Sequence, residues 1–408
     1  MKFQEARDII LLERSDDNMK RVYACLMLLL MLSSMMGCSS TTNPENENYL
    51  LDEKFDTEAY LPGYDMQPAF QSADGQFCSE GSVYYTILNS WIFYYDRESD
   101  TSGILCGKPE CAHKDASCNA YAGNMMGCIQ VYDGKLYWLS GSTLYRMDLD
   151  GTNREVFQKV EAMNGLSPQF YIHRGYLYTC LVGFQVTSAE AQGTMEIKRY
   201  PLGEEAEPVI VFHKEYPYNN IWYKCRFSGN SMYFMIDDAQ DLDVESMMQH
   251  RELYEYHLKT GELEQLWSLE ENWTVYGMEV TEEGVYVLNL RTDYNVTDRS
   301  HIYLSYFDFR QREMIRYEEI ALDEGYMGAN LVDGYILAFR YDEDKTEYQV
   351  YDLNYQNVAE GVVDGGANAM GIDEYGIYTQ NIHQKFSIAE ISRSDMHQSR
   401  NIMENEAM

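Results

Sequence analysis

A strand pattern that repeats along most of the chain is the feature that most constrains its fold. A glycine followed closely by an aromatic or apolar strand recurs at intervals of 53, 41, 54, 55, 50 and 42 residues. A period of about 40 to 55 residues with several short strands per repeat is typical of repeat folds such as propellers. The glycines concerned are Gly81, Gly134, Gly175, Gly229, Gly284, Gly334 and Gly376.

The clearest repeat begins at Val131 and reads VYDGKLYWLSGSTLYRMDLDGTNREVF. It contains four short apolar strands and two Asp-Gly pairs, and Asp-Gly favours the positive φ angles of tight hairpin turns. Two hairpins in series form one four-stranded blade. An apolar third-strand residue, usually aromatic, alternates with the glycines along the chain. These residues are Tyr95, Met147, Tyr200, Tyr256, Phe307, Tyr351 and Ile391.

An isolated blade cannot bury both of its faces, so blades stack radially around an axis. We therefore expect an all-β chain with a β-propeller of about seven blades over residues 71–395. Six or eight blades, or a row of separate β-sandwiches, are the alternatives.

Two segments of the clearest repeat carry a resemblance to known propellers. Leu136, Tyr137 and Trp138, with residues 149–154, resemble a blade of the YWTD propellers of lipoprotein receptors. The repeat over about residues 75–395 resembles the TolB-like propeller domains of uncharacterised clostridial lipoproteins. This resemblance implies architecture without supplying a function.

The amino terminus has the pattern of an export signal. Lys20 and Arg21 precede the apolar run 22–36, which suits a signal peptide better than a bilayer-spanning helix. Gly37 and Cys38 follow, and this junction resembles a bacterial lipoprotein signal. The resemblance implies removal of residues 1–37, acylation of Cys38 and anchoring at the outer face of the cell membrane. Ordinary secretion and a retained helix are the alternatives.

The segments that flank the repeats have less regular patterns. Residues 1–18 are either a start-site artefact or a long region before the signal. Residues 38–70 begin with small polar side chains and predict a flexible tether. Residues 396–408 follow the last repeat and are expected to form a C-terminal tail.

The net charge of the chain is -35. Such a field repels phosphate backbones, so nucleic acid is excluded as a partner, whereas cations and basic partners are favoured.

Three consecutive repeats carry insertions between their second and third strands, at residues 182–194, 237–250 and 291–299. In a propeller these connections open on the same face as the connections between blades, so we expect one enlarged rim. Carboxylates there are candidates for holding a basic partner or a hard cation, and a solvated surface is the alternative. They are Asp237, Asp238, Asp241, Asp243, Glu245, Asp293 and Asp298.

A cysteine-rich array lies in the connection from the first repeat to the second. Cys106, Cys111, His113 and Cys118 have the spacing C-x4-C-x-H-x4-C. Three thiolates and an imidazole can complete a tetrahedral zinc shell, whereas an oxidising compartment permits a disulfide instead. Structural zinc, a disulfide and free thiols all remain open at this point.

The common short catalytic motifs are absent from the sequence, including the G-x-S-x-G elbow, H-E-x-x-H and the phosphate-binding loop. We therefore predict a monomeric, non-enzymatic module that binds an extracellular protein, peptide or glycan at one propeller rim. The alternative is a carbohydrate-active or other hydrolytic propeller with carboxylates from several blades. Convergent carboxylates in an open channel would favour hydrolysis, and a filled channel would favour binding.

Overall fold

The fold is taken from a computed structural model. It describes residues 51–73, 77–123, 128–161, 166–186, 191–217, 221–239, 249–293, 299–326, 328–342, 345–364, 368–381 and 386–405. The predicted signal segment 1–37 and Cys38 lie outside these ranges. Among the described residues, no helix has the length and apolar character needed to cross a membrane.

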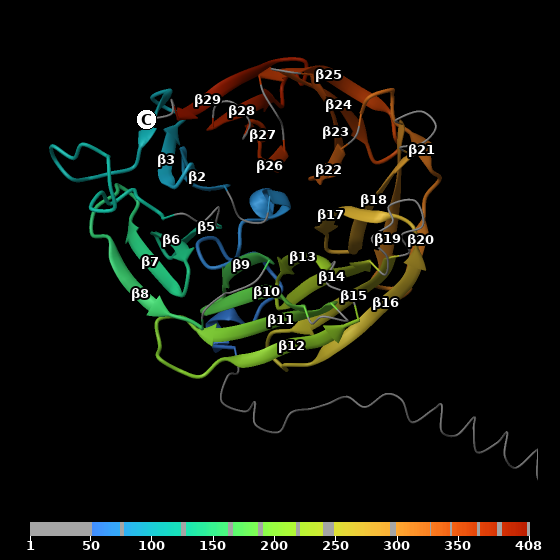
Figure 1. Ribbon diagram of the computed structural model, residues 1–408, viewed down its shortest axis with the longest axis horizontal. Coiled ribbons are helices and arrows are strands. Elements are labelled where there is room, and N and C mark those ends of the chain that lie inside the picture. The colour runs from blue at the N-terminus through green and yellow to red at the C-terminus, as the bar shows by residue number, and fades with distance from the viewer. Residues whose placement is uncertain are drawn as a thin grey trace, which may run out of the picture. The chain divides into compact units, whose positions relative to one another are not determined.

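Seven antiparallel sheets are arranged around a central axis, each with its first strand innermost (Figure 1). The prediction of an all-β propeller with seven blades is thereby confirmed, and the six-blade, eight-blade and sandwich alternatives are wrong. Each blade is continuous in sequence.

The first four blades have the following strands. Blade one contains β1 (Phe77–Glu80), β2 (Val83–Leu88), β3 (Trp91–Asp96) and β4 (Thr101–Ile104). Blade two contains β5 (Ile129–Tyr132), β6 (Lys135–Ser140), β7 (Thr143–Asp148) and β8 (Glu155–Lys159). Blade three contains β9 (Leu166–His173), β10 (Tyr176–Val186), β11 (Ala191–Pro201) and β12 (Val209–Tyr216). Blade four contains β13 (Ile221–Ser228), β14 (Ser231–Ala239), β15 (Gln249–His257) and β16 (Leu263–Glu271).

The last three blades complete the ring. Blade five contains β17 (Thr274–Val280), β18 (Gly284–Asp293), β19 (Arg299–Asp308), β20 (Glu313–Arg316) and the short β21 (Ile320–Ala321). Blade six contains β22 (Gly328–Val332), β23 (Tyr335–Asp342), β24 (Lys345–Asp352) and β25 (Asn357–Asp364). Blade seven contains β26 (Asn368–Ile372), β27 (Gly376–Asn381), β28 (Phe386–Ser392) and β29 (Ser399–Asn405). The propeller therefore extends past residue 395, and most of the expected C-terminal tail is the outer strand β29.

The repeat glycines serve the turns between first and second strands. In the Asp133-Gly134 and Asp333-Gly334 turns both residues have positive φ, at 46° and 67° and at 45° and 76°. This is the backbone of the type I′ hairpin, which matches the twist of its strands. Glycine relieves the strain of positive φ at Gly81, Gly134, Gly175, Gly229 and Gly334. At Gly284 and Gly376 it avoids a clash instead, because a Cβ atom would lie 2.1 Å and 2.6 Å from a carbonyl oxygen of the third strand.

The ring closes through side chains that join blade one to blade seven. Tyr84 on β2 donates a hydrogen bond of 2.6 Å to Asp373, and Arg97 donates one of 2.7 Å to the hydroxyl of Tyr378. Arg400 on β29 donates to the hydroxyl of Tyr95 at 2.8 Å. Closure thus rests on packing and polar contacts between complete blades.

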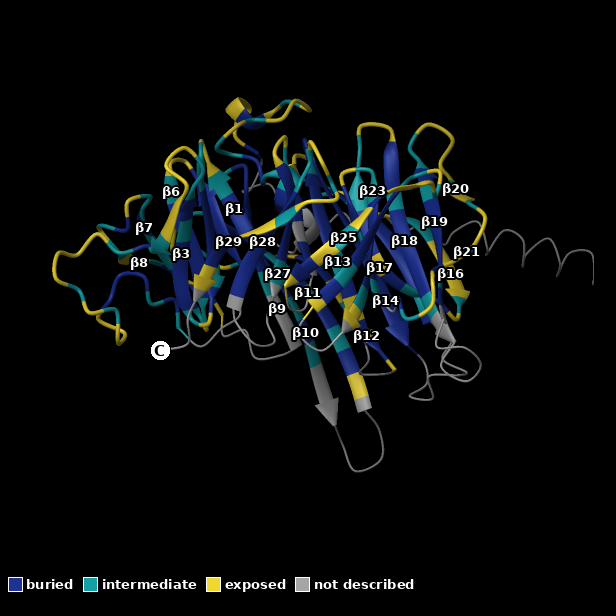
Figure 2. Ribbon diagram, turned by 90° about the horizontal axis from the view of Figure 1, so that it is seen from above, coloured by how far each residue is buried: buried dark blue, intermediate teal, exposed yellow. Residues whose placement is uncertain are grey.

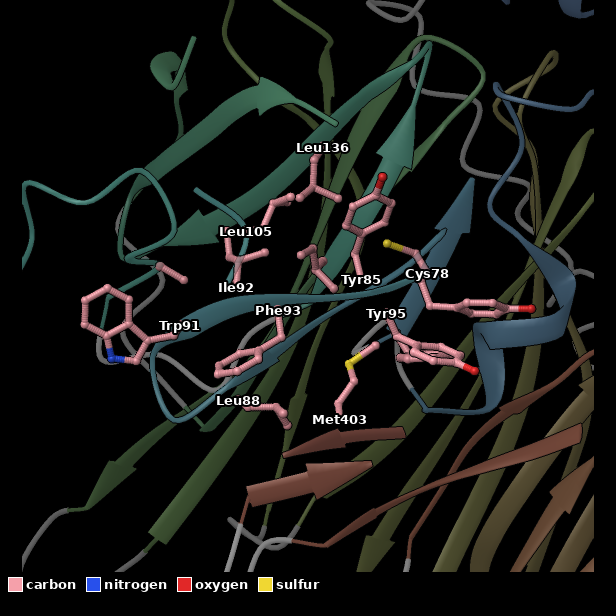
Figure 3. Packing of buried hydrophobic residues seen from close by; sticks show 14 of the residues in the cluster. Cys78, Tyr85, Leu88, Trp91, Ile92, Phe93, Tyr95, Leu105, Leu136 and Met403 are labelled. Carbon is pink, nitrogen blue, oxygen red and sulfur yellow. The ribbon is translucent and has the colours of Figure 1, made fainter. Parts of the chain in front are cut away.

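The hydrophobic core lies between blades rather than at one centre. One cluster joins Leu136 of blade two and Met403 of blade seven to the strands of blade one, including Tyr85 and Phe93 (Figure 3). Trp138 is fully buried and stacks on Tyr145 at a centroid distance of 5.4 Å. Radial stacking therefore buries the apolar face that each blade could not cover alone.

The segment 51–73 packs on the propeller, so the prediction of a flexible tether through residue 70 is wrong for residues 51–70. It contains two short 3-10 helices, η2 (Glu53–Phe55) and η3 (Pro68–Ala73). Phe55 is buried, and η3 lies at the centre of the ring (Figure 1). There η3 contacts the innermost strands β1, β17, β22 and β26.

The insertion in blade three is a strand extension. Strands β10 and β11 each have 11 residues, and their ribbon projects from one side of the disc (Figure 2). Asp241, Asp243, Glu245 and Asp298 lie outside the described residues.

Candidate functional site

A cavity of about 720 Å³ lies at one mouth of the central channel. Its wall comes mainly from the segment 51–73 and from the turns between first and second strands of blades four to seven. Such turns meet around the axis because every blade places its innermost strand there. His173 of blade three and Arg393 of blade seven also line it. The wall is rich in carboxylates: Glu58, Glu279, Glu282, Asp333, Asp373 and Glu374.

The segment 51–73 supplies the base of this cavity. Pro68 and Ala69 belong both to η3 and to the cavity lining. At Gly371 on β26, a Cβ atom would lie 2.3 Å from the carbonyl oxygen of Ala69 and 2.5 Å from the ring of Phe70. The backbones of β26 and η3 therefore touch. The central channel is filled by the protein's own chain.

A buried arginine holds this segment in place. The Arg174 side chain has no exposed surface and donates two hydrogen bonds to the carboxylate of Asp65, at 2.7 and 2.9 Å. It also donates to the carbonyl oxygens of Phe55 and Ala59, both at 2.9 Å. Its other partners are the Asn230 side chain at 2.5 Å and the carbonyl oxygen of Thr57. All donors of the guanidinium fork are directed at the segment and the neighbouring turn.

His173 is a second buried contact between the segment and the blades. Its Nδ1 accepts a hydrogen bond of 3.1 Å from the Met66 amide, and its Nε2 lies 3.0 Å from the carbonyl oxygen of Gly229. These partners require a neutral ring with the proton on Nε2. Burial lowers the pKa of His173 to about 4, although the carboxylate of Asp65 opposes this shift.

Negative charge dominates the cavity wall. Burial raises the pKa of Glu279, although the Gly334 amide donates to its carboxylate at 3.0 Å. Of the two arginines in the lining, Arg226 donates to backbone carbonyls within the wall, including that of Met278 at 2.9 Å. Arg393 donates to the backbone carbonyl of Asp373 at 2.8 Å and to the carboxylate of Asp333 at 3.4 Å, so the other carboxylates of the wall carry its excess negative charge. The cavity is thus suited to a positively charged group.

Two of the acidic residues predicted for the rim lie inside the protein. Asp237 and Asp238 on β14 are 2% and 3% exposed, so the expectation that they face solvent is wrong. Both residues belong to strand β14, whose residues are all buried. Adjacent strand residues point to opposite faces of the sheet, and both faces of this sheet are covered by protein. Asp293 ends β18, and the other rim candidates lie outside the described residues.

Burial changes the ionisation of both aspartates. It raises the pKa of Asp237 to about 7 and that of Asp238 to about 6. The Val275 amide donates to Asp237 at 3.1 Å. With its amide nitrogen turned toward Asp237, Gln249 donates to both carboxylate oxygens, at 2.5 and 2.7 Å. Asp237 is therefore part of a satisfied polar network between blades four and five.

The predicted cysteine array does converge. One ligand atom from each of Cys106, Cys111, His113 and Cys118 lies within 4.8 Å of the other three. Nδ1 of His113 is 3.3 Å from Sγ of Cys118. None of the seven cysteines in the described residues forms a disulfide. This arrangement can hold a metal ion.

The surroundings of the cluster have opposite effects on the pKa of two of its cysteines. Burial opposes ionisation of Cys106, but the amides of Lys108 and Asn119 donate to its sulfur and lower its pKa overall. Burial raises the pKa of Cys118 to about 12, although the Ala120 amide donates to its sulfur.

Comparison with known proteins identifies a fold and no family. No family model matches the chain, and no curated protein matches it. A solved structure from a study of two prolyl endopeptidases is similar to 82% of this chain, with 14% identity and a TM-score of 0.50. The chain spans about half the length of that protein, since 50% of it is covered.

Other similar solved structures are more distant. TolB from Acinetobacter baumannii matches 81% of this chain and 79% of its own, with 12% identity and a TM-score of 0.35. An ancestral GH74 enzyme matches 84% of this chain and 48% of its own, with 9% identity and a TM-score of 0.45. At 14% identity, the likeness to the structure from the prolyl endopeptidase study shows a shared fold and leaves the activity undetermined.

Sequence reasoning missed the cavity, although a signal for it was present. Asp333 directly precedes a repeat glycine, Glu282 lies two residues before Gly284, and Asp373 lies three residues before Gly376. Equivalent turns of neighbouring blades adjoin in a propeller, so alignment of the repeats at their glycines would have placed these acids together.

Proposed function

We propose that this protein is a lipoprotein of the clostridial type that acts as a binding module outside the cell. In this proposal a lipid on Cys38 anchors it, and the acidic cavity binds a basic segment of a peptide or protein. The observation that carries the proposal is the filled channel, whose mouth is left as a cavity with a closed base and an acidic wall.

The dimensions and charge of the cavity support this choice. A volume of about 720 Å³ is in the range of ligand sites and is large enough for a few side chains. The overall charge of -35 attracts cationic partners over distance, and the turns around the cavity concentrate that field. Lysine and arginine side chains are the complementary groups.

The proposed anchor would hold the disc close to the membrane. Leu51 is buried in the protein, so the chain from Cys38 to Leu51 would connect the lipid to the propeller. An extended chain of this length reaches roughly 45 Å at most. A partner in the same envelope would thus meet the propeller near the membrane surface.

Binding can be measured by calorimetry with a lysine- and arginine-rich peptide and a glutamate-rich peptide of equal length. We expect binding of the basic peptide alone, and weaker binding as salt is raised. The test variant is Glu282→Lys with Glu374→Lys, because both residues line the cavity and are exposed. We expect its affinity to fall at least tenfold.

The matched control is Glu204→Lys with Glu205→Lys, an equal charge change in the exposed turn between β11 and β12. We expect this control to bind within about twofold of wild type, because screening weakens charges outside the cavity. Equal weakening in both double variants would show that binding depends on overall charge and would refute the cavity site. Turnover of a glycoside or peptide substrate, lost in Asp373→Asn, would favour the hydrolytic alternative instead.

A further inference from the structure

We propose that Cys106, Cys111, His113 and Cys118 bind one zinc ion, which fixes the connection between blades one and two. This inference is independent of the proposed binding function, because the cluster lies at a different place in the ring. It rests on the convergence of four ligand side chains and on the backbone around them.

The distances in the cluster fit a tetrahedral site. Zinc binds thiolate sulfur at about 2.3 Å, which places two sulfurs of one tetrahedron roughly 3.8 Å apart. The four ligand atoms lie within 4.8 Å of one another, and the imidazole nitrogen of His113 is 3.3 Å from the sulfur of Cys118. Closure around an ion therefore needs only side-chain shifts of less than a bond length.

Backbone amides surround the two outermost ligands of the array in the manner that thiolates require. The amides of Lys108 and Asn119 donate to Cys106, and the amide of Ala120 donates to Cys118. In two of these contacts the donor lies two residues after the cysteine. Such N–H donors spread the negative charge of metal-bound sulfur, since outer hydrogen bonds orient and tune metal ligands.

Few side chains of the loop that carries the ligands are buried. Residues 107–110 and 114–117 are exposed, whereas Cys118 is buried and the other three ligands are partly buried. Turn hydrogen bonds occur at each end, from the Cys118 amide to Asp115 at 3.1 Å and from the Cys111 amide to Lys108 at 3.4 Å. Because so few apolar groups are buried, metal ligation is the stabilising interaction that suits this loop.

A disulfide accounts for the cluster less well. A disulfide between any two of the three cysteines would leave the third thiol and the imidazole of His113 beside the bond. Neither group would have a function there. The remaining cysteines of the described residues, Cys78, Cys128, Cys180 and Cys225, are buried elsewhere and form no disulfide with the cluster.

The loop is docked on a turn of blade two. The Gly107 amide donates to the carbonyl oxygen of Gly151 at 3.1 Å, and the Asn119 side chain donates to the same oxygen at 2.8 Å. Arg154 donates to the carbonyl oxygen of Cys118 at 2.8 Å. An ion held by the loop would thereby brace the junction of the two blades.

The test is metal analysis and intact mass of the full chain purified without reductant or chelator. We expect about one zinc per chain, three alkylatable thiols released by a strong chelator, and a lower melting temperature after zinc removal. His113→Ala and Cys111→Ser should lose at least nine-tenths of the zinc. His113→Cys should keep it, because four cysteines also bind zinc.

Cys225→Ala is the matched control, since this buried cysteine lies outside the cluster, and it should retain wild-type zinc. An intact mass about two daltons below that of the fully reduced chain, together with the absence of zinc, would show a disulfide and overturn the proposal. Wild-type zinc content in both His113→Ala and Cys111→Ser would also overturn it. If either variant fails to fold, zinc retention in His113→Cys and the chelator experiment on wild type decide the question.

Discussion

The guanidinium of Arg174 holds the carboxylate of Asp65 through two hydrogen bonds, from Nε at 2.7 Å and from Nη2 at 2.9 Å. The two residues are 109 positions apart, and both are buried. This pair joins the segment before the first blade to blade three. It therefore determines whether the base of the cavity stays in place.

Arg174→Met tests this pair. Removal of one partner leaves the Asp65 charge buried and unpaired, so we expect unfolding to require about 3–5 kcal/mol less free energy. Urea unfolding measures the change. The control is Arg310→Met, whose ion pair with Glu283 is 3.8 Å long with both side chains at least 72% exposed. Arg310→Met should lower the free energy of unfolding by less than about 1 kcal/mol. Equal losses in the two variants would contradict the role given to Arg174.

His173 predicts a loss of stability in mild acid. Its pKa is lowered to about 4 in the fold from 6.5, so the unfolded chain binds more protons between these values. The stabilisation is complete above pH 6.5 and is lost as pH falls toward 4. His173→Gln should flatten the pH dependence of unfolding free energy in this window. An unchanged slope would show that other groups cause the pH dependence. The control is His257→Gln, at the end of β15.

The contribution of Asp237 to stability has the opposite pH dependence. Its pKa is raised to about 7 from 3.8, so the folded protein binds the extra proton between these values. The contribution of this group is most favourable below pH 3.8 and is lost as pH rises through 7. Asp237→Asn should therefore stabilise the protein at pH 8, by on the order of 2 kcal/mol, and much less at pH 5. Destabilisation at both pH values would refute the buried, proton-binding carboxylate.

Gly371→Ala tests the contact that fills the channel. A methyl group there would meet the backbone of Ala69 at 2.3 Å, so β26 and η3 must separate. We expect a loss of about 1–3 kcal/mol and faster proteolysis within residues 51–73. Gly328→Ala is the control, because nothing lies within 4 Å of its Cβ position. Equal protease resistance in both variants would contradict the proposed contact.

Gly151→Ala tests the docking of the cysteine loop. Gly151 and Gly141 both have positive φ, at 78° and 61°, so alanine strains the backbone at either position. Only at Gly151 would the new methyl group lie 2.9 Å from the backbone nitrogens of Cys106 and Gly107. Thermal unfolding should show an extra loss of about 1–3 kcal/mol relative to Gly141→Ala. Equal losses would show that the contact is unimportant.

The blades and the cysteine cluster could be predicted from the sequence. The blade pattern consists of turn glycines and alternating apolar strands that recur at a regular period. Each of these features depends on residues a few positions apart, so it can be recognised in the sequence alone. The four ligands from Cys106 to Cys118 lie within one loop, and for that reason their convergence was also predictable.

The contacts between blades could not be predicted from the sequence. The cavity wall, the Arg174–Asp65 pair and the filling of the channel by η3 join residues from different blades or far apart in the chain. The burial of Asp237 depends likewise on blade five. The physical reason is that closure of the ring sets these contacts, and closure depends on the packing of all seven blades at once.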